Sequence, residues 1–110
     1  MRLSSKERRQ YPRCAMDETA ELRIYGGETM SSQVKNISWA GLLLSDVDKI
    51  DKLGMLEVRQ LRNRPIAVTF GEMDLTARGS IIRVNPKDQT VAIRVSSTSN
   101  DNLWREHCMA

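Results

Sequence analysis

From Thr19 onward, apolar and polar residues alternate with a period of two, which is the pattern of strands that bury one face. The first such segment covers residues 20–25, and Gly26 and Gly27 after it offer the positive φ angles that a two-residue hairpin requires. Alternation and short apolar runs predict further strands over residues 28–37, 42–44, 55–61, 66–70, 75–84 and 91–95. Six or seven short strands, with no long amphipathic helix between them, favour an all-β fold: a small antiparallel six- to seven-stranded β-barrel.

The segments between these strands have the composition of turns. Asp46–Lys52 is charged and poor in β-branched residues, so we expect a loop or one helical turn there, before a strand at Met55–Leu61. Gly79 falls inside a predicted strand, where a glycine favours a β-bulge. Asn85–Asp88 contains proline and other turn-forming residues, and it predicts a hairpin loop.

Residues 97–110 depart from the pattern of strands. Ser99 or Asn100 can cap a short helix that carries Leu103 and Trp104. We expect this C-terminal helix to cover one end of the barrel, with Trp104 closing the core.

Length and composition fit one globular domain. The chain has 110 residues, of which 40% are apolar and 28% charged. No segment has the roughly 18 apolar residues of a membrane helix, and residues 1–13 lack the apolar stretch of a secretory signal. We therefore expect a cytoplasmic protein without a membrane partner.

Cys14 and Cys108 form no Cys-x-x-Cys pair, and His107 is the one histidine, so we expect free thiols and no metal site.

Positive charge is concentrated at the start of the chain. Residues 1–13 carry five basic groups and one acidic group, whereas the other 97 residues carry 12 basic and 13 acidic groups. We expect a flexible basic tail over residues 1–14, and a nearly neutral barrel with its C-terminal helix over residues 15–110. A concentrated basic tail suits a compact anion or an acidic partner, whereas long nucleic acid favours charge spread over a face.

Two short motifs flank the first predicted hairpin. Arg9–Arg13 reads Arg-x-x-x-Arg, with Arg8 directly before it, and Asn36–Gly41 reads Asn-x-Ser-x-x-Gly. In order, spacing and position relative to a small barrel, this pair resembles the signature of the PilZ domain family, in which the two motifs lie roughly 20 to 30 residues apart. The resemblance covers essentially the whole chain, and it implies a bacterial receptor for the second messenger cyclic di-GMP.

The resemblance also implies which residues bind the ligand. They are Arg9, Arg13, Asn36, Ser38 and Gly41. Asn36 stands where Asp is more frequent in the family, which removes a negative charge and changes how the guanine N1 and N2 donors are met. In the family, an additional arginine before the first motif accompanies binding of an intercalated ligand dimer, and the resemblance extends this role to Arg8.

The chemistry of cyclic di-GMP explains these residue types. Its two phosphates each carry one negative charge, and its two guanines present O6 and N7 atoms that accept paired hydrogen bonds from a guanidinium group. Arginine suits both groups, whereas lysine suits only the phosphate. Asn36 can present a donor and an acceptor to a base edge, and Ser38 can donate to a phosphate or brace the turn. Gly41 permits a backbone angle or a close approach that a Cβ would block.

The sequence leaves the roles of four other residues open. Trp39 lies inside the second motif, where its ring can stack on a base or pack against the barrel. Arg78, Arg83 and Arg94 fall on faces of the predicted sheet, where most arginines are solvated, and the sequence does not decide which of them reaches the ligand.

We therefore expect a receptor that is not an enzyme, uses no cofactor, and orders its arginine tail on cyclic di-GMP to signal to an unknown protein partner. His107 has no carboxylate at a spacing that would orient it, and no glycine-rich phosphate loop follows a strand. One alternative is a PilZ-like module that binds no ligand and acts in protein–protein interaction. Another is a small nucleic-acid-binding barrel, which would need strand aromatics; the chain has only five aromatic residues, and we expect no DNA or RNA partner.

Overall fold

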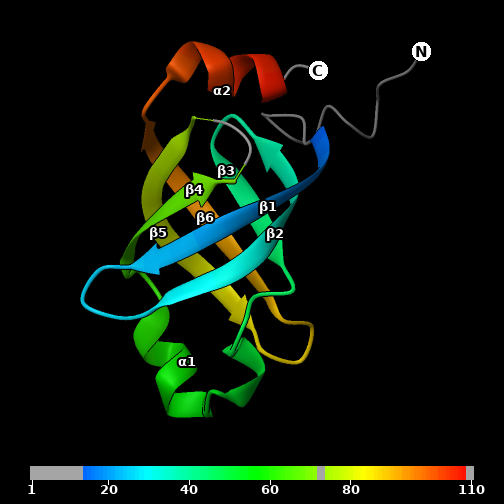
Figure 1. Cartoon of the computed structure of the whole chain (residues 1–110). Coiled ribbons are helices and arrows are strands. Elements are labelled where there is room, and N and C mark those ends of the chain that lie inside the picture. The colour runs from blue at the N-terminus through cyan, green and yellow to red at the C-terminus, as the bar shows by residue number, and fades with distance from the viewer. Residues whose placement is uncertain (1–13, 72–73, 109–110) are drawn as a thin grey trace, which may run out of the picture.

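The computed structural model describes residues 14–71 and 74–108, and within these ranges six strands close into an antiparallel barrel (Figure 1). The strands follow one another around the barrel in the order β1, β2, β3, β6, β5 and β4, and β4 pairs with β1. Their bounds are β1 (Cys14–Ile24), β2 (Thr29–Ser38), β3 (Gly41–Ser45), β4 (Pro65–Phe70), β5 (Thr76–Asn85) and β6 (Thr90–Thr98). The predicted all-β barrel is confirmed, with six strands.

The interior of the barrel is filled by the side chains that point inward at every second position. One inward row crosses four strands, because Ile37 pairs with Leu42, Leu42 with Ile93, and Ile93 with Ile81. All four are buried, and each such side chain stabilises the fold by roughly 1.5–3 kcal/mol relative to an exposed one. Because a slip of one residue would turn this row outward, the core also fixes which residues lie on the outer face.

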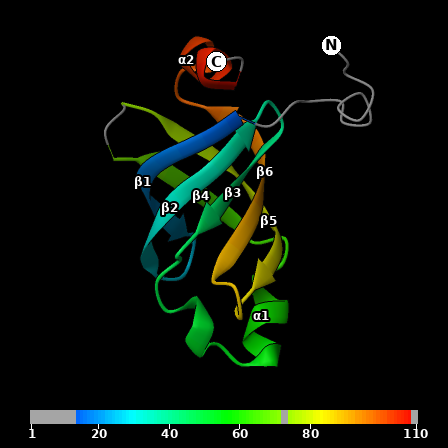
Figure 2. The ribbon, with the colours of Figure 1, turned by 90° about the vertical axis from the view of Figure 1, so that its right-hand side faces the viewer.

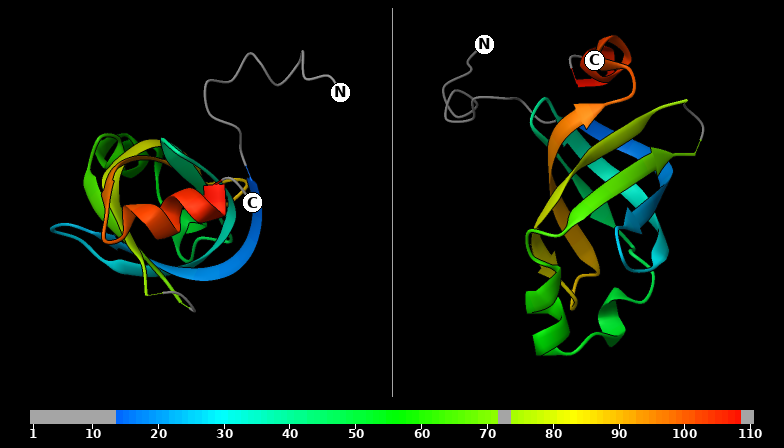
Figure 3. Two further views of the ribbon diagram at one scale, coloured as in Figure 1. Left: turned by 90° about the horizontal axis from the view of Figure 1, so that it is seen from above. Right: turned by 90° about the vertical axis from the view of Figure 1, so that its left-hand side faces the viewer.

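The C-terminal helix α2 (Asp101–Cys108) lies across one open end of the barrel (Figure 3). The side-chain oxygen of Asn100 accepts a hydrogen bond from the Leu103 N–H at 3.1 Å, so Asn100 is the cap. Trp104 is 1% exposed and sets its ring edge-on to Phe70, with ring centroids 6.0 Å apart. The predicted helix and the core position of Trp104 are confirmed. Cys108 is also buried there, and the side chain of Cys14 lies outside the described residues, so the state of the two thiols stays a prediction.

The segment Met55–Leu61 forms an α-helix, α1, and the prediction of a strand there is wrong. Its residues are mostly good helix formers, and it begins after Gly54, whose N–H donates to Oε1 of Glu57 at 3.0 Å. The helix lies at the end of the barrel opposite α2 (Figure 2). The single helical turn expected before it is present as a 3₁₀ turn at Ile50–Lys52. No helix in the described part of the chain is long and apolar enough to cross a membrane.

The turn between β1 and β2 differs from the prediction. Gly26 has a φ of 79°, but Gly27 is not in the positive-φ region, and the Ile24 N–H donates to the Glu28 carbonyl at 3.1 Å. Three residues therefore make this turn, in place of the predicted two.

The bulge predicted at Gly79 is confirmed: the register of β5 against β6 shifts between residues 78 and 79, and a Cβ on Gly79 would overlap the Arg94 carbonyl oxygen.

Candidate functional site

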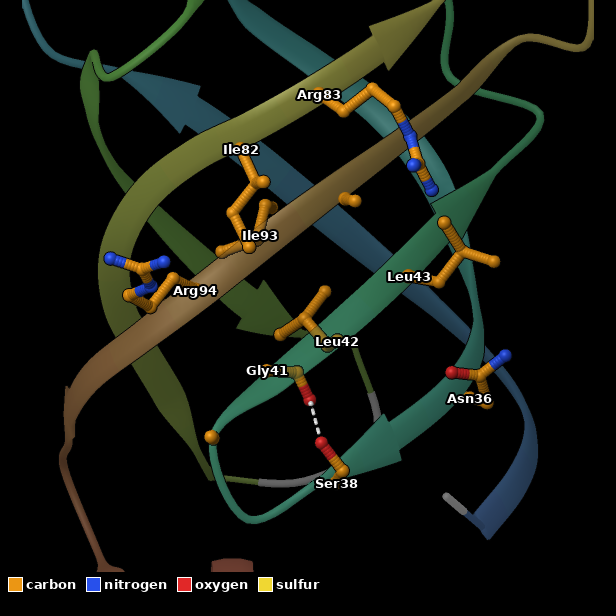
Figure 4. Close-up of a pocket in the computed structure, with 11 residues that line it drawn as sticks. Asn36, Ser38, Gly41, Leu42, Leu43, Ile82, Arg83, Ile93 and Arg94 are labelled. Atoms are coloured by element: carbon orange, nitrogen blue, oxygen red, sulfur yellow. Dashed lines mark hydrogen bonds between the residues drawn. The ribbon is translucent and has the colours of Figure 1, made fainter. Parts of the chain in front are cut away.

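A groove with a volume of about 250 Å³ runs over the outer surface of the barrel, across β2, β3, β6 and β5 (Figure 4). It contains the three signature residues of the second sequence motif. Its lining consists of Asn36, Ser38, Ala40, Gly41, Leu42, Leu43, Ile82, Arg83, Ala92, Ile93 and Arg94.

Strand register assembles this groove from two outward rows of side chains. In the first row Asn36 pairs with Leu43, Leu43 with Ala92, and Ala92 with Arg83, so one residue comes from each of four strands. Three inter-strand spacings separate the ends of the row, a distance of about 14 Å along the sheet.

The second outward row carries the other two motif residues. Ser38 pairs with Gly41, Gly41 with Arg94, and Arg94 with Ser80. Glycine at position 41, like the alanine at position 92 in the first row, leaves little side chain above the sheet. The groove is therefore open at these two positions, and the polar side chains of Asn36 and Ser38 lie at one end of their rows.

Arg83 and Arg94 give the groove its charge. No acidic side chain belongs to its lining, and neither guanidinium group forms an ion pair with any side chain that the structure describes. Both side chains are exposed. Figure 4 shows Arg83 extending from β5 toward Leu43. A bulge between residues 81 and 83 also turns Ile82 outward, and its side chain is 39% exposed beside Arg83. The lining of the groove thus contains two arginines that can turn to an anionic ligand, and Figure 4 shows the Arg94 side chain extending from β6 toward β5.

Ser38 and Gly41 shape the turn between β2 and β3. The Ser38 hydroxyl donates to the Gly41 carbonyl at 3.3 Å (Figure 4), so it braces the turn, and its oxygen keeps lone pairs that can accept from a ligand. A Cβ on Gly41 would lie 2.6 Å from the Ile93 carbonyl oxygen. Only glycine therefore allows β3 to approach β6 this closely.

The side-chain amide of Asn36 forms no hydrogen bond with any residue in the described ranges. It is half-buried at the end of the groove nearest β1. Because a half-buried amide gains from having partners, this group is suited to meet the donors and acceptors of a base edge.

Trp39 lies outside this groove and contacts α2. The guanidinium carbon of Arg105 lies 5.2 Å from the centre of the Trp39 ring, and the Trp39 carbonyl accepts a hydrogen bond from Nε1 of Trp104 at 3.2 Å. The ring is 38% exposed and lines a separate, smaller hollow beside the end of β6. The structure therefore connects Trp39 to the helix that closes the barrel.

The structure joins some of the predicted site residues and leaves others undescribed. Asn36, Ser38 and Gly41 come together in the groove, whereas Arg8, Arg9 and Arg13 lie outside the described residues. The sequence did not choose among the strand arginines: Arg83 and Arg94 line the groove, and Arg78 does not. Their alternation with apolar residues shows that they face outward, but only the strand register shows which of them lie beside the second motif. In the part of the chain that the structure describes, no three His, Cys, Asp or Glu side chains are placed to hold a metal ion.

The barrel has a PilZ-like fold, which comparison with solved structures shows. No protein-family model matches the sequence, and no curated protein matches it. Solved structures do match, and PilZ domains are among them. Because their identity with the chain is low, these structures establish its fold alone.

Three of these structures cover nearly the whole chain. The Bacillus subtilis inhibitor of motility (MotI/DgrA) matches with a TM-score of 0.61 and 16% identity over 92% of this chain; the chain spans 49% of that protein. The PilZ domain of CeSA from a cellulose-synthesizing bacterium has a TM-score of 0.61 and 12% identity, covering 89% of this chain and 91% of that one. The PilZ domain of YcgR from Escherichia coli, whose structure contains c-di-GMP, has a TM-score of 0.56 and 13% identity, covering 91% of this chain and 86% of that one.

Proposed function

We propose that this protein is a receptor for cyclic di-GMP, which it binds in the groove between the second motif and the arginines of β5 and β6. One observation carries the proposal: strand register gathers Asn36, Ser38 and Gly41 with Arg83 and Arg94, whose guanidinium groups have no ion-pair partner among the described side chains. The fold supports it, because the YcgR PilZ domain has the same fold and was solved with c-di-GMP.

Each part of the groove matches a part of the ligand. The Asn36 amide can pair with a guanine edge through both a donor and an acceptor. Arg83 and Arg94 can each form two parallel hydrogen bonds to a guanine O6 and N7 or to a phosphate. The backbone at Gly41 lets the ligand lie close to the sheet, because no side chain rises there. These roles are those of a binding site and include no catalytic step.

The N-terminal arginines complete the proposed site. Arg9 and Arg13, with Arg8 before them, are expected to close over the ligand from the side opposite the sheet. Charge-assisted contacts of this kind contribute about 1.5–3 kcal/mol each, and part of that gain offsets the ordering of the tail, about 1–2 kcal/mol per residue. The ordered tail, the ligand and the adjoining strands would form a new surface for a protein partner. Through Arg8, the ligand is expected to bind as an intercalated dimer.

Calorimetric titration tests the proposal. We expect cyclic di-GMP to bind, with two nucleotides per chain if the dimer forms, while GTP, cyclic GMP and a mixed-sequence oligonucleotide do not. Arg9→Ala and Arg13→Ala should each abolish measurable binding with an unchanged circular dichroism spectrum. Affinity for the oligonucleotide alone would replace the proposal with a nucleic-acid-binding barrel. A folded wild-type protein that binds none of the four ligands would favour an interaction module without a nucleotide.

A further inference from the structure

A second groove, with a volume of about 310 Å³, lies between α1 and β5. Val58, Ile82 and Val84 give it an apolar floor, and the other lining residues are Arg59, Arg62 and Arg83. It adjoins the proposed nucleotide groove, because Ile82 and Arg83 line both. Arg59 and Arg62 belong to the second groove alone.

Helix α1 exposes apolar side chains that nothing in the described chain covers. Met55 is 77% exposed and Leu56 is 68% exposed, and none of the seven residues of α1 is buried. On a helix, residues three and four apart share a face, which places Met55 beside Val58 and Arg59 on the side of the groove. So short a helix has little stability of its own, and only Val58 and Leu61 of its seven residues are half-buried. A partner that covers Met55 would supply burial that the helix lacks.

The charge of this surface has one sign. The three lining arginines are exposed, no acidic side chain lines the groove, and none of the three guanidinium groups forms an ion pair with a side chain that the structure describes. Three like charges around an apolar floor repel one another until an anionic group lies between them. A partner that complements this groove therefore carries both acidic and apolar side chains.

We propose that the α1–β5 groove is a docking site for a segment of a partner protein that carries acidic residues next to large apolar ones. The apolar residues of that segment cover Met55 and the Val58–Ile82 floor, and its carboxylates pair with Arg59 and Arg62. A protein segment fits better than a nucleic acid because, among the residues that the structure describes, no aromatic side chain lines the groove on which a base could stack. The inference does not rest on the nucleotide site, since Arg59 and Arg62 lie outside it.

Selection from a random peptide library displayed on phage, against the full chain, tests this surface. We expect the enriched peptides to combine Asp or Glu with Leu, Phe or Trp. In fluorescence polarisation, the double variant Arg59→Ala/Arg62→Ala should bind those peptides about tenfold more weakly or worse. Both positions are on a helix, where alanine is favourable, so this variant is expected to fold. The matched control is Arg23→Ala/Arg78→Ala, which removes two exposed arginines that line neither groove and should bind the peptides like wild type.

Titration with cyclic di-GMP separates the two proposals, because Arg59→Ala/Arg62→Ala should leave that affinity unchanged. The docking site is overturned if no peptide is enriched, if enriched peptides lack acidic residues, or if they bind the double variant as tightly as wild type. It is also overturned if a labelled mixed-sequence oligonucleotide binds through Arg59 and Arg62, which would assign the groove to nucleic acid. If the chain self-associates and the same double variant loses this association, the groove is assigned to a second copy of the chain. That outcome also overturns the proposal.

Discussion

Arg83 and Arg94 are the two positively charged side chains that the barrel itself contributes to the proposed nucleotide groove. Each can form charge-assisted hydrogen bonds worth about 1.5–3 kcal/mol, and tenfold in affinity corresponds to about 1.4 kcal/mol. We therefore predict that Arg83→Ala and Arg94→Ala each weaken cyclic di-GMP binding by about ten- to a hundredfold in calorimetric titration. The affinity of Arg94→Lys should lie between those of wild type and Arg94→Ala, because lysine keeps the charge and loses the paired donors.

Arg78→Ala is the control for this prediction. Arg78 is exposed on the same strand as Arg83 but lies outside the groove, so its removal should leave the affinity unchanged. Wild-type affinity in both Arg83→Ala and Arg94→Ala would show that the ligand does not occupy the groove.

Gly41 is needed for the approach of β3 to β6. A Cβ at this position would lie 2.6 Å from the Ile93 carbonyl oxygen, and a backbone atom cannot move aside as a flexible side chain can. We predict that Gly41→Ala lowers the free energy of unfolding by about 1–3 kcal/mol, measured by urea denaturation. Gly27→Ala is the comparison, because the nearest atom to its Cβ would be Cγ2 of Ile24 at 3.4 Å and its φ is not positive. Equal stability of the two variants would contradict this account of Gly41.

The site residues show which part of the candidate site could be predicted from the sequence. The motif residues Asn36, Ser38 and Gly41 are close together in the chain, at the end of β2 and the start of β3, so their joint presence in one site could be predicted. Arg83 and Arg94 meet that turn through the pairing of β5 with β6 and of β6 with β3. That pairing depends on bulges between residues 78 and 79 and between residues 81 and 83, of which the sequence indicated only the first.

Among the elements, α2 connects the end of the barrel to the turn of the second motif. Trp104 packs edge-on against Phe70 and donates from Nε1 to the Trp39 carbonyl at 3.2 Å. We predict that Trp104→Ala lowers the free energy of unfolding by about 3–5 kcal/mol. Trp104→Phe keeps an aromatic ring and loses the Nε1–H donor, so this variant should lower the free energy of unfolding by about 1–3 kcal/mol.

Urea denaturation of the two Trp104 variants beside Arg105→Ala measures these effects. Arg105 is exposed and contacts the Trp39 ring, and its removal should change the free energy of unfolding by no more than about 1 kcal/mol. If Trp104→Ala is no less stable than Arg105→Ala, α2 does not close the core.

Helix α1 is the element that the sequence pattern mispredicted. Over seven residues, a helix with one half-buried side and a strand with one half-buried face have similar apolar spacing, and we expected a strand among strands. The local chemistry decides otherwise: Gly54 begins the helix, Glu57 accepts its N–H, and most of the residues that follow favour helix. The two long strands β2 and β5 were the most predictable, because each was expected from a segment of ten residues, over which a period of two is easier to tell from a helical period.

The exposed side of α1 provides a test of this assignment. We predict that the double variant Met55→Gln/Leu56→Gln changes the free energy of unfolding by less than about 0.5 kcal/mol, because the two side chains are 77% and 68% exposed. Leu44→Ala, at a fully buried position in β3, should by contrast lower it by about 2–5 kcal/mol. A loss from Met55→Gln/Leu56→Gln comparable to that from Leu44→Ala would mean that Met55 and Leu56 pack against the core and are not exposed.

At the scale of the whole molecule, stability and positive charge belong to different parts of the chain. The apolar core of the described structure runs from Ala20 to Cys108, and every strand of the barrel pairs on both sides. Residues 1–13 hold a net charge of +4, while the rest of the chain is close to neutral. The fold can therefore be tested apart from the ligand chemistry of the tail.

Deletion of residues 1–13 should leave the barrel folded and remove the affinity for cyclic di-GMP. Because all six strands that close the barrel lie from Cys14 onward, we predict a free energy of unfolding within about 0.5 kcal/mol of the full chain. Loss of the contacts from Arg8, Arg9 and Arg13 should weaken binding by at least about a hundredfold. A full-length chain with these three arginines changed to Gln distinguishes charge from chain length: equal loss in both variants assigns the affinity to the guanidinium groups. A deletion variant that binds at full strength would place the whole site on the barrel, and one that unfolds would place the tail in the core.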